Sequence, residues 1–227
     1  MISSDLQVSS GPPAKVGFVR IGDGSCRNGC LADSTLTSLC SLFVNSERWY
    51  TMSLSQISLR PHDVCVSLQL VLTPKFSYRE LARDVGLSLG EAHNSVKRLE
   101  QARLFLADPG SVNLPALSEL LVHGIPYVFP GQLGPDTRGI PTAHSGPALA
   151  KRLSGADAIV WPSCEGDIRG HALVPLCASA PDFVRQNPEL YRWLTLVDAL
   201  RVGRARDRRL AEEILRGELE RQAVHDD

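Results

Sequence analysis

The sequence predicts an α+β fold, and three patterns lead to this class. Two capped helix starts, at Ser77 and Ser88, stand on either side of a glycine turn. Farther along, the turn sequence Asp-Pro-Gly-Ser at residues 108–111 is flanked by short apolar runs, which is typical of a hairpin. Apolar residues then recur at helical spacing in two late segments, Pro181 to Gly203 and Arg204 to Gln222. These patterns indicate a mainly helical chain with a small amount of strand.

The central stretch predicts two short helices joined by a tight turn. Ser77 precedes Glu80 by three positions, and this spacing allows a reciprocal hydrogen-bonded cap. Ser88 and Glu91 repeat the pattern at the start of the second helix. Gly86 lies between the helices, where a positive φ is commonly needed. The apolar residues expected on the facing sides of the two helices are Leu81, Ala82, Val85, Ala92, Val96 and Leu99.

The second helix carries a polar and basic strip opposite its apolar side. Such a strip is typical of a recognition helix, whose exposed side chains enter the major groove of DNA. A helix used only for protein packing is the alternative explanation. We take the following residues as the candidate DNA-contacting set: Ser88, Gly90, His93, Asn94, Lys97 and Arg98.

The flanking segments predict further elements of the same domain. A helix is expected to begin at Pro61 and to end before Thr73-Pro74, because the residue before a proline is pushed out of the helical region. The hairpin follows the second helix. Asn113 then caps a short helix, Leu114 to His123, which Gly124 is expected to end.

In the motifs LARDVGLS and VKRLE the sequence resembles the bacterial winged helix-turn-helix transcriptional regulators, in the MarR-like style. The resemblance covers roughly Leu59 to Leu114. It implies that the hairpin is the wing and that the second helix reads double-stranded DNA as part of transcriptional regulation. A homodimer on a symmetric operator is the expected form, with the C-terminal helices as the candidate dimer surface.

Three parts are expected along the chain. Residues 1–52 are rich in serine and glycine, so we expect a disordered extension or a true translation start at Met52. Residues 53–123 form the winged helix-turn-helix domain. Residues 124–227 form a mixed α/β effector or dimerisation region, which resembles only bacterial proteins with no assigned activity. The strands expected in this region are Tyr127 to Phe129, Ala158 to Trp161 and His171 to Pro175.

Composition limits the classes of protein. The 227 residues are 43% apolar and carry a net charge of −1, so attraction to DNA must come from local clusters of charge. The sequence has no apolar run of membrane-spanning length and no secretory signal, and it therefore predicts a cytoplasmic protein without membrane contact. Six cysteines without repeated spacing predict reduced thiols.

Two other functions remain open from the sequence. The first is an antitoxin-like or scaffold module that uses the winged helix to contact a partner protein. The second is an enzyme that uses the cluster from Cys164 to His171, where a thiol and an imidazole are close in sequence. The cluster lacks an oxyanion-hole motif, and triad members usually come from distant segments. We therefore expect no enzyme activity.

No cofactor or metal is expected either. Cys26, Cys30 and Cys40 lack a fourth zinc ligand nearby, and a set of Cys164, His144 and His171 fits no common ligand spacing. No glycine-rich phosphate loop is present, so a nucleotide enzyme is unsupported.

Three minor features of the second half have a structural and a functional interpretation. Tyr127, Phe129, Trp161 and Trp193 either pack in the core or line an effector pocket. Arg138 and Arg169 either form surface salt bridges or meet an anion. The arginine-rich run that ends the chain is expected to be a solvated helix face with ion pairs four residues apart.

Overall fold

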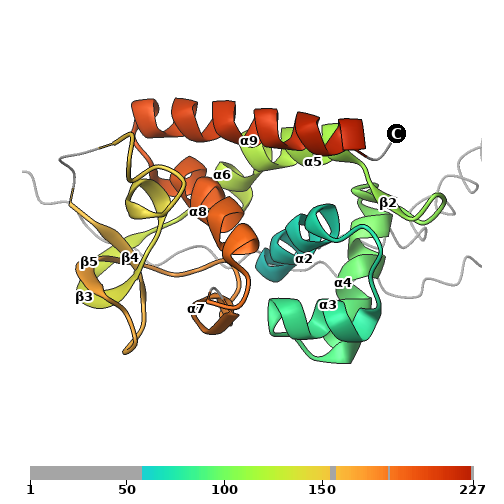
Figure 1. Cartoon of the computed structure of the whole chain (residues 1–227), viewed down its shortest axis with the longest axis horizontal. Helices are drawn as coiled ribbons and strands as arrows, with labels where there is room; N and C mark the ends of the chain where they lie inside the picture. The colour runs from blue at the N-terminus through green and yellow to red at the C-terminus, as the bar shows by residue number, and fades with distance from the viewer. Residues whose placement is uncertain (1–57, 154–156, 184, 226–227) are drawn as a thin grey trace, which may run out of the picture. The chain divides into compact units, whose positions relative to one another are not determined.

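The computed structural model describes residues 58–153, 157–183 and 185–225, and it confirms the α+β class (Figure 1). The expectations for residues 1–52, and for zinc at Cys26, Cys30 and Cys40, lie outside the described residues. The elements in chain order are α2 (Pro61–Leu72), α3 (Tyr78–Val85), α4 (Leu89–Gln101), β1 (Phe105–Leu106), β2 (Ser111–Val112), α5 (Leu114–Glu119), α6 (Ile125–Val128), β3 (Leu133–Pro141), β4 (Ile159–Pro162), β5 (Ile168–Leu173), α7 (Ala180–Phe183), α8 (Pro188–Val202) and α9 (Ala205–His225).

The first helices and the hairpin lie where the sequence predicts them. Helix α2 begins at Pro61, and the carboxylate of Asp63 accepts a hydrogen bond of 2.7 Å from the backbone N–H of Arg60. Strands β1 and β2 pair antiparallel, with Phe105 opposite Val112. Their connection contains the predicted Asp-Pro-Gly-Ser turn. These elements therefore follow from local caps and turn residues.

The helix expected to stop at Gly124 continues instead. Helix α5 passes through a π-helical turn, Leu120–Gly124, into α6, so the strand expected at residues 127–129 is wrong. The reason is a stripe of fully buried side chains, Leu117, Leu121 and Ile125, which recurs every four residues across the glycine. Packing of that stripe outweighs the tendency of Gly124 to end a helix.

A small closed sheet follows. Strand β3 pairs antiparallel with both β4 and β5, and β4 pairs parallel with β5. The expected strands at 158–161 and 171–175 are confirmed with shifted bounds, whereas β3 was not predicted. Its sequence, LGPDTRGIP, is rich in glycine and proline, which normally interrupt strands. Glycine is required at Gly139, because a Cβ there would lie 2.1 Å from the carbonyl oxygen of Trp161.

The expected helix over 181–203 is two helices. Helix α7 ends at Phe183, and α8 starts anew at Pro188 after Asn187, whose side-chain oxygen accepts a hydrogen bond of 3.1 Å from the N–H of Leu190. The predicted apolar stripe of α8 is confirmed as buried: Leu190, Trp193, Leu194, Val197 and Leu200. The helix expected at 204–222 is confirmed as α9, which lies across α5 and α8 (Figure 1).

The boundary expected at residue 123 does not separate two cores. The described residues from 58 onward form one unit, in which α2 packs on α8, α3 on α7 and α5 on α9. One continuous hydrophobic cluster includes side chains from both sides of that boundary, such as Leu68 and Leu196. Helix α2 is therefore a central helix of the whole unit, since its apolar residues occur on every side.

A buried carboxylate joins the sheet to α8. Asp198 accepts hydrogen bonds from the Thr142 hydroxyl at 2.8 Å and the Trp161 indole N–H at 2.7 Å, and Arg201 pairs with it at 2.6 Å. Burial raises the pKa of Asp198, while Arg201 opposes that shift. Such a fully paired group stabilises one arrangement of the elements that supply its partners.

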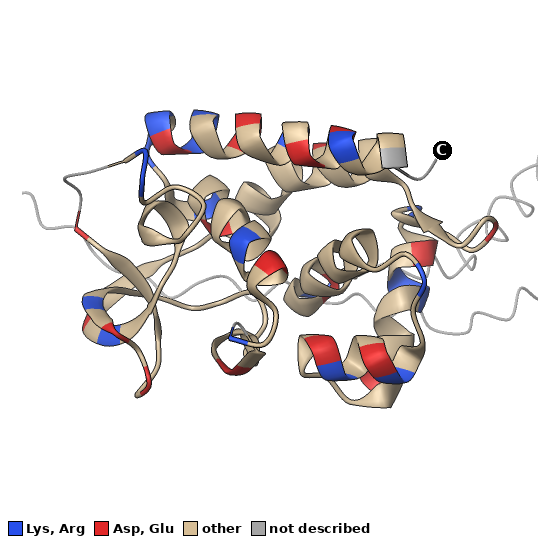
Figure 2. Ribbon diagram, viewed as in Figure 1, with Lys and Arg blue, Asp and Glu red and all other residues tan. Residues whose placement is uncertain are grey.

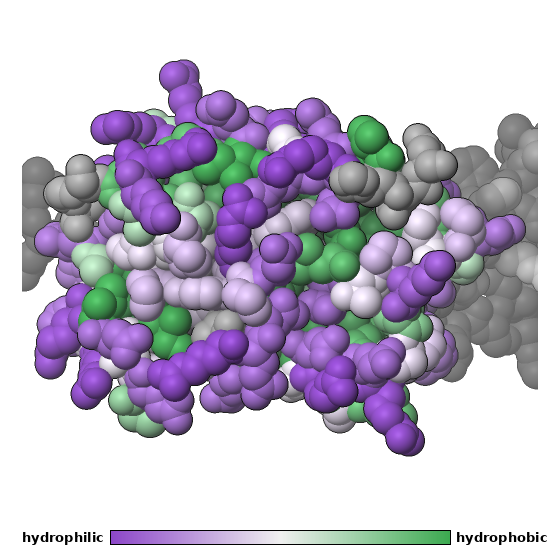
Figure 3. Space-filling view, viewed as in Figure 1, coloured by the Kyte–Doolittle hydropathy of each residue, from purple (hydrophilic) through white to green (hydrophobic). Residues whose placement is uncertain are grey.

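The described helices include none that is long and apolar enough to cross a membrane. On the face shown in Figure 3, hydrophilic side chains predominate and apolar side chains form small separate patches.

Candidate nucleic-acid interface

The cap and turn of α3 have the predicted geometry. The Ser77 hydroxyl accepts a hydrogen bond of 3.2 Å from the N–H of Glu80, and the Glu80 carboxylate accepts one from the N–H of Ser77. The Ser77 hydroxyl also donates to the Glu80 carboxylate at 2.8 Å, and this bond, together with that from the Ser77 N–H, lowers the pKa of Glu80. Gly86 ends the helix with φ of +66°, in the left-handed region that glycine tolerates. Both ends of α3 are thus encoded by the local sequence.

The cap of α4 is only half of the predicted reciprocal pair. The Ser88 hydroxyl accepts a hydrogen bond of 3.2 Å from the N–H of Glu91. The Glu91 carboxylate, however, does not return to Ser88. It accepts hydrogen bonds from Arg98 at 2.7 Å and from Arg60 at 3.1 Å. The expectation of a reciprocal cap is therefore wrong here, because charged donors bind a carboxylate more strongly than a backbone N–H does.

The two sides of α4 differ in solvent exposure as the helical spacing predicts. The inward residues Ala92, Val96 and Leu99 are at most 1% exposed. On the opposite side the candidate residues Ser88, Gly90, His93, Asn94 and Lys97 are exposed. An ideal Cβ built at Gly90 has no atom within 4 Å, so this part of the helix is open to a close approach.

Arg98 differs from the rest of the candidate set. Its guanidinium donates to both carboxylate oxygens of Asp63, at 2.8 and 2.7 Å, and to Glu91 and Ser95. Only 15% of its side chain is exposed, and 1% of that of Asp63. The structure therefore removes Arg98 from the exposed strip, because its donors are already occupied inside the domain.

These ion pairs fix how α4 sits on α2. The hydrogen bonds that Arg98 donates to Asp63 raise the pKa of its guanidinium, which stays charged. Arg98, together with His62, holds the pKa of Glu91 below its usual range. A bidentate bridge of this kind defines both the distance and the rotation between two helices. The role of Asp63 was missed by sequence reasoning, although a lone acid directly before the apolar run of residues 64–72 can indicate a buried partner.

The exposed strip has an aromatic neighbour on α3. The ring of Tyr78 meets the ring of His93 edge to face, with centroids 4.8 Å apart. This contact supports the His93 side chain on the outer surface of α4. Leu89, at the start of α4, is 53% exposed and adds apolar surface beside the same strip.

Positive charge around the helix-turn-helix is modest. Acidic and basic residues alternate along α3 and its neighbours (Figure 2). Arg83 pairs with Asp84 at 3.1 Å, and Arg60 with Glu91. Within the described part of the chain, four exposed cations of this region form no ion pair with a carboxylate: Lys75, Arg79, Lys97 and Arg103. Electrostatic attraction of anions to this region is therefore local and depends on few charged groups.

The enzyme candidate does not assemble among the described residues. Cys164 is exposed and makes no hydrogen bond with His171. His171 lies 4.0 Å from the carboxylate of Asp157, and His144 is hydrogen-bonded at 3.0 Å to the Asp157 carbonyl. No group of three metal-ligating side chains occurs in the described ranges. The thiol and the imidazole therefore form no nucleophile pair in this structure.

The aromatic and arginine candidates of the second half differ in how deeply they are buried. Trp161 and Trp193 are core residues, whereas Tyr127 is 83% exposed, so of the two interpretations core packing is wrong for Tyr127. Phe129 is half-buried against the core. Arg169 forms the expected surface salt bridge, with Asp136 at 3.2 Å, and the residue Arg138 donates to the Gly166 carbonyl at 2.6 Å.

Two buried thiols were also missed. A hydrogen bond with Cys65 lowers the pKa of Cys177 to about 6, against the effect of burial, and Ser179 contributes. Burial raises the pKa of Cys65. Cys177 and Ser179 both donate to the Val85 carbonyl at the end of α3. They thereby attach the helix-turn-helix to α7, and no local motif could have indicated that contact.

Comparison with known proteins leaves the family of this chain open. No protein-family model, curated protein or solved structure matched it, so the resemblance to MarR-like regulators rests on the motifs in the sequence and remains a prediction.

Proposed function

We propose that this chain binds double-stranded DNA through α4 and regulates transcription in the cytoplasm. The elements from α2 to β2 would form a winged helix-turn-helix domain, with β1 and β2 as the wing. The observation that carries the proposal is the exposed strip of α4, which lies opposite a completely buried side of the same helix. A helix arranged in this way can enter a groove while its inner side keeps its packing.

The strip residues have separate roles in this proposal. Asn94 lies toward the start of α4, where recognition helices usually reach base edges, and its amide can pair bidentately with adenine. Lys97 lies farther along and meets a phosphate as a point charge. Gly90 has no side chain to hold the backbone away from the duplex. His93 is supported by Tyr78 and adds a further polar contact.

Arg98 acts as a positioning residue in the proposal. Its ion pairs with Asp63 and Glu91 hold α4 against α2. Contacts to DNA gain precision when the helix that carries them is held by buried partners. The wing contributes little charge, because its tip carries Asp108 and no lysine or arginine. Recognition therefore depends mainly on α4.

Two copies on a symmetric operator are part of the proposal. Dimeric readers match palindromic sites because the protein and the operator share a two-fold axis. A small-molecule effector or a partner protein would then act through the region after residue 123. Gel filtration with light scattering, with and without operator DNA, measures the number of copies bound.

Selection from random duplex DNA tests the proposal. The purified chain should enrich a defined motif, and the Asn94→Ala variant should relax one position in it. Binding should also weaken with salt, with a slope of log K against log salt no steeper than about 4 per bound copy, because four unpaired cations among the described residues lie around the strip and each neutralised phosphate contributes about 0.9. Arg185→Ala, an exposed change far along the chain, is the matched control. Absence of any enriched motif at low salt would reject DNA reading.

A protein-interaction module is the second candidate, and one observation favours it. Leu89 and Tyr78 place exposed apolar surface next to the strip, and such surface suits a protein partner better than phosphates. Co-expression with the product of an adjacent gene, followed by gel filtration, tests this alternative. Leu89→Asp should disrupt that complex while leaving the helix folded, because Leu89 is exposed. If the variant changed only DNA binding, the partner hypothesis would be discarded.

A further inference from the structure

The start of α9 carries a cluster of free positive charge. The cluster consists of Arg152, Arg206, Arg208 and Arg209, all exposed. Considering only residues with a described position, none of the four forms an ion pair with a carboxylate. Basic residues mark the first turns of α9 in Figure 2. We call these four residues the arginine cluster.

The other arginines of α8 and α9 form ion pairs. Arg192 of α8 meets Glu218, and Arg201 meets Asp198. On α9, Glu212 pairs forward with Arg216 at 3.0 Å rather than back with Arg208. A glutamate four residues before its partner is the more favourable order on a helix. The expected pairing four residues apart is confirmed for Glu212 and Arg216, whereas Arg221 pairs with Glu218 three residues before it. The first turns of α9 retain unneutralised charge.

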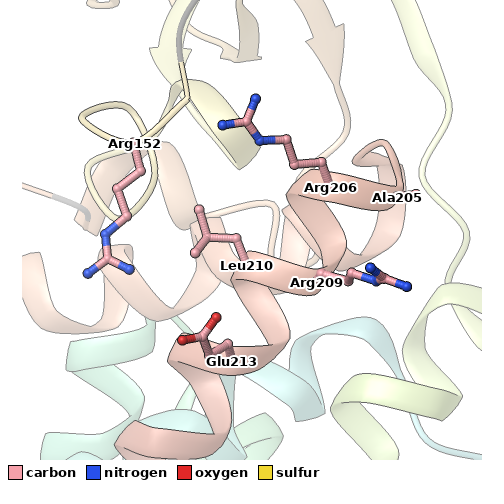
Figure 4. Close-up of a pocket in the computed structure, with 6 residues that line it drawn as sticks. All are labelled: Arg152, Ala205, Arg206, Arg209, Leu210 and Glu213. Atoms are coloured by element: carbon pink, nitrogen blue, oxygen red, sulfur yellow. The ribbon is translucent and has the colours of Figure 1, made fainter.

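Two adjoining hollows surround the cluster. The first has a volume of about 530 Å³ and is lined by Arg152, Arg206, Arg209, Leu210 and Glu213. Figure 4 shows Arg152 and Arg206 on either side of Leu210, with Arg209 projecting to the other side of the helix. The two arginines come from segments far apart in the sequence, so the tertiary structure brings them to one hollow.

The second hollow begins where Arg209 projects. It has a volume of about 320 Å³, and its lining includes Arg208, Arg209, His123 and the exposed aromatic residue Tyr127. Ala205 and Arg209, four positions apart, line both hollows and form the ridge between them. An aromatic ring therefore lies beside the arginine cluster, and its ring is not used by the core.

We propose that these two hollows form a site for a nucleotide. Guanidinium groups bind phosphate oxygens in pairs of hydrogen bonds, and the cluster supplies such groups without having to break ion pairs first. An exposed tyrosine ring is a platform on which a base can stack. Glu213 offers a carboxylate that can accept a hydrogen bond from a ribose hydroxyl. The ligand is thus a phosphate-bearing molecule with a planar ring.

The site is separate from the proposed DNA interface. No residue of α3 or α4 lines either hollow. The same chemistry is present in a free nucleotide and in a nucleic-acid strand, so the test must distinguish these two sources. The inference does not depend on recognition of duplex DNA by α4.

Titration calorimetry of the full chain at low salt tests the proposal, with ATP, inorganic tripolyphosphate and a short single-stranded DNA oligonucleotide as probes. Arg206→Gln with Arg209→Gln should weaken ATP binding by about tenfold or more, since charge-assisted hydrogen bonds to phosphate are lost. The matched control is Arg185→Gln with Arg221→Gln, which removes the same charge from two exposed arginines elsewhere. ATP binding that is absent in the unmodified chain, or that falls equally in both double variants, would overturn the site.

Two further variants sharpen the result. Tyr127→Ala should weaken ATP but not tripolyphosphate, because only ATP has a base to stack, and an equal loss for both probes would reject the stacking role. Lys97→Ala should leave ATP binding unchanged, which keeps this test separate from the test of α4. If the oligonucleotide competes with ATP and binds more tightly, the site takes a strand; if ATP binds more tightly, it takes the free nucleotide.

Discussion

The first turns of α9 and the last turns of α4 are both basic, yet the arginines of α9 are unpaired within the described residues and that of α4 is paired. Arg98 of α4 is enclosed by Asp63 and Glu91, whereas Arg206 and Arg209 of α9 have no carboxylate partner among the residues described. In the sequence both segments are helical stretches with basic residues. The difference shows that the availability of an arginine for a ligand depends on distant carboxylates, which a helical pattern does not reveal.

The largest expected effect concerns Arg98. Arg98→Ala should cost about 3 to 5 kcal/mol of unfolding free energy, because Asp63 would be left buried without its partner. Denaturant unfolding of the variant measures this loss. Lys97→Ala, the adjacent exposed cation, is the control and should cost under about 0.5 kcal/mol. Equal midpoints for the two variants would show that Arg98 is not held as the structure indicates.

Leu99 tests the buried side of the same helix. Leu99→Ala should cost about 2 to 5 kcal/mol, since the side chain is 1% exposed and its removal leaves a cavity. Thermal and denaturant melts report the change. A loss well below 1 kcal/mol would mean that the inner face of α4 packs loosely, and the contrast between its two sides would disappear.

Asn94 tests the outer side of α4. Asn94→Ala should lose about 1 to 3 kcal/mol of affinity on the selected duplex and relax the choice at one base pair. Fluorescence anisotropy with matched and mismatched sites measures both effects, and circular dichroism checks the fold. An affinity unchanged on every site would favour the protein-interaction module.

Lys97 should have a smaller and less specific effect. Lys97→Ala should weaken specific and random duplexes alike and should flatten the slope of log K against log salt by about 1 per bound copy, because each copy releases one fewer counterion. Titrations at several salt concentrations measure the slope. If only the specific duplex were affected, Lys97 would be reading a base rather than a phosphate.

The smallest change in unfolding free energy is expected for a substitution of Arg206. Arg206→Ala should change the unfolding free energy by less than about 0.5 kcal/mol, because the residue is exposed and has no ion-pair partner within the described ranges. Denaturant midpoints check this value against Arg98→Ala. A large loss would indicate that the arginine cluster stabilises the fold instead of remaining free for a ligand.

Features set by neighbouring residues were predicted well. Ser77 and Gly86 begin and end α3 where expected, because caps and left-handed turns depend on bonds within a few residues. The inward positions of α4 and α8 were also predicted, since helical spacing alone decides which side chains share a face.

Features set by distant partners were missed. Residues 127–129 form a helix end rather than a strand, because the stripe ending at Ile125 continues a buried helix through Gly124. Strand β3 was missed because its glycines fit close contacts with β4 and β5 that the local sequence does not encode. Arg98 was placed toward DNA because Asp63 lies on another helix.

The sequence by itself determined the α+β class, the helices α3 and α4 with the glycine turn between them, the reciprocal cap of α3, the hairpin turn and the apolar sides of the main helices, because each depends on spacing or on bonds between near neighbours. Only the tertiary structure decided that α2 joins both halves in one core, that Arg98 is internal and that Arg152 lines the same hollow as the start of α9. These outcomes depend on packing between segments far apart in the chain, and the energy of such contacts is not contained in any local pattern.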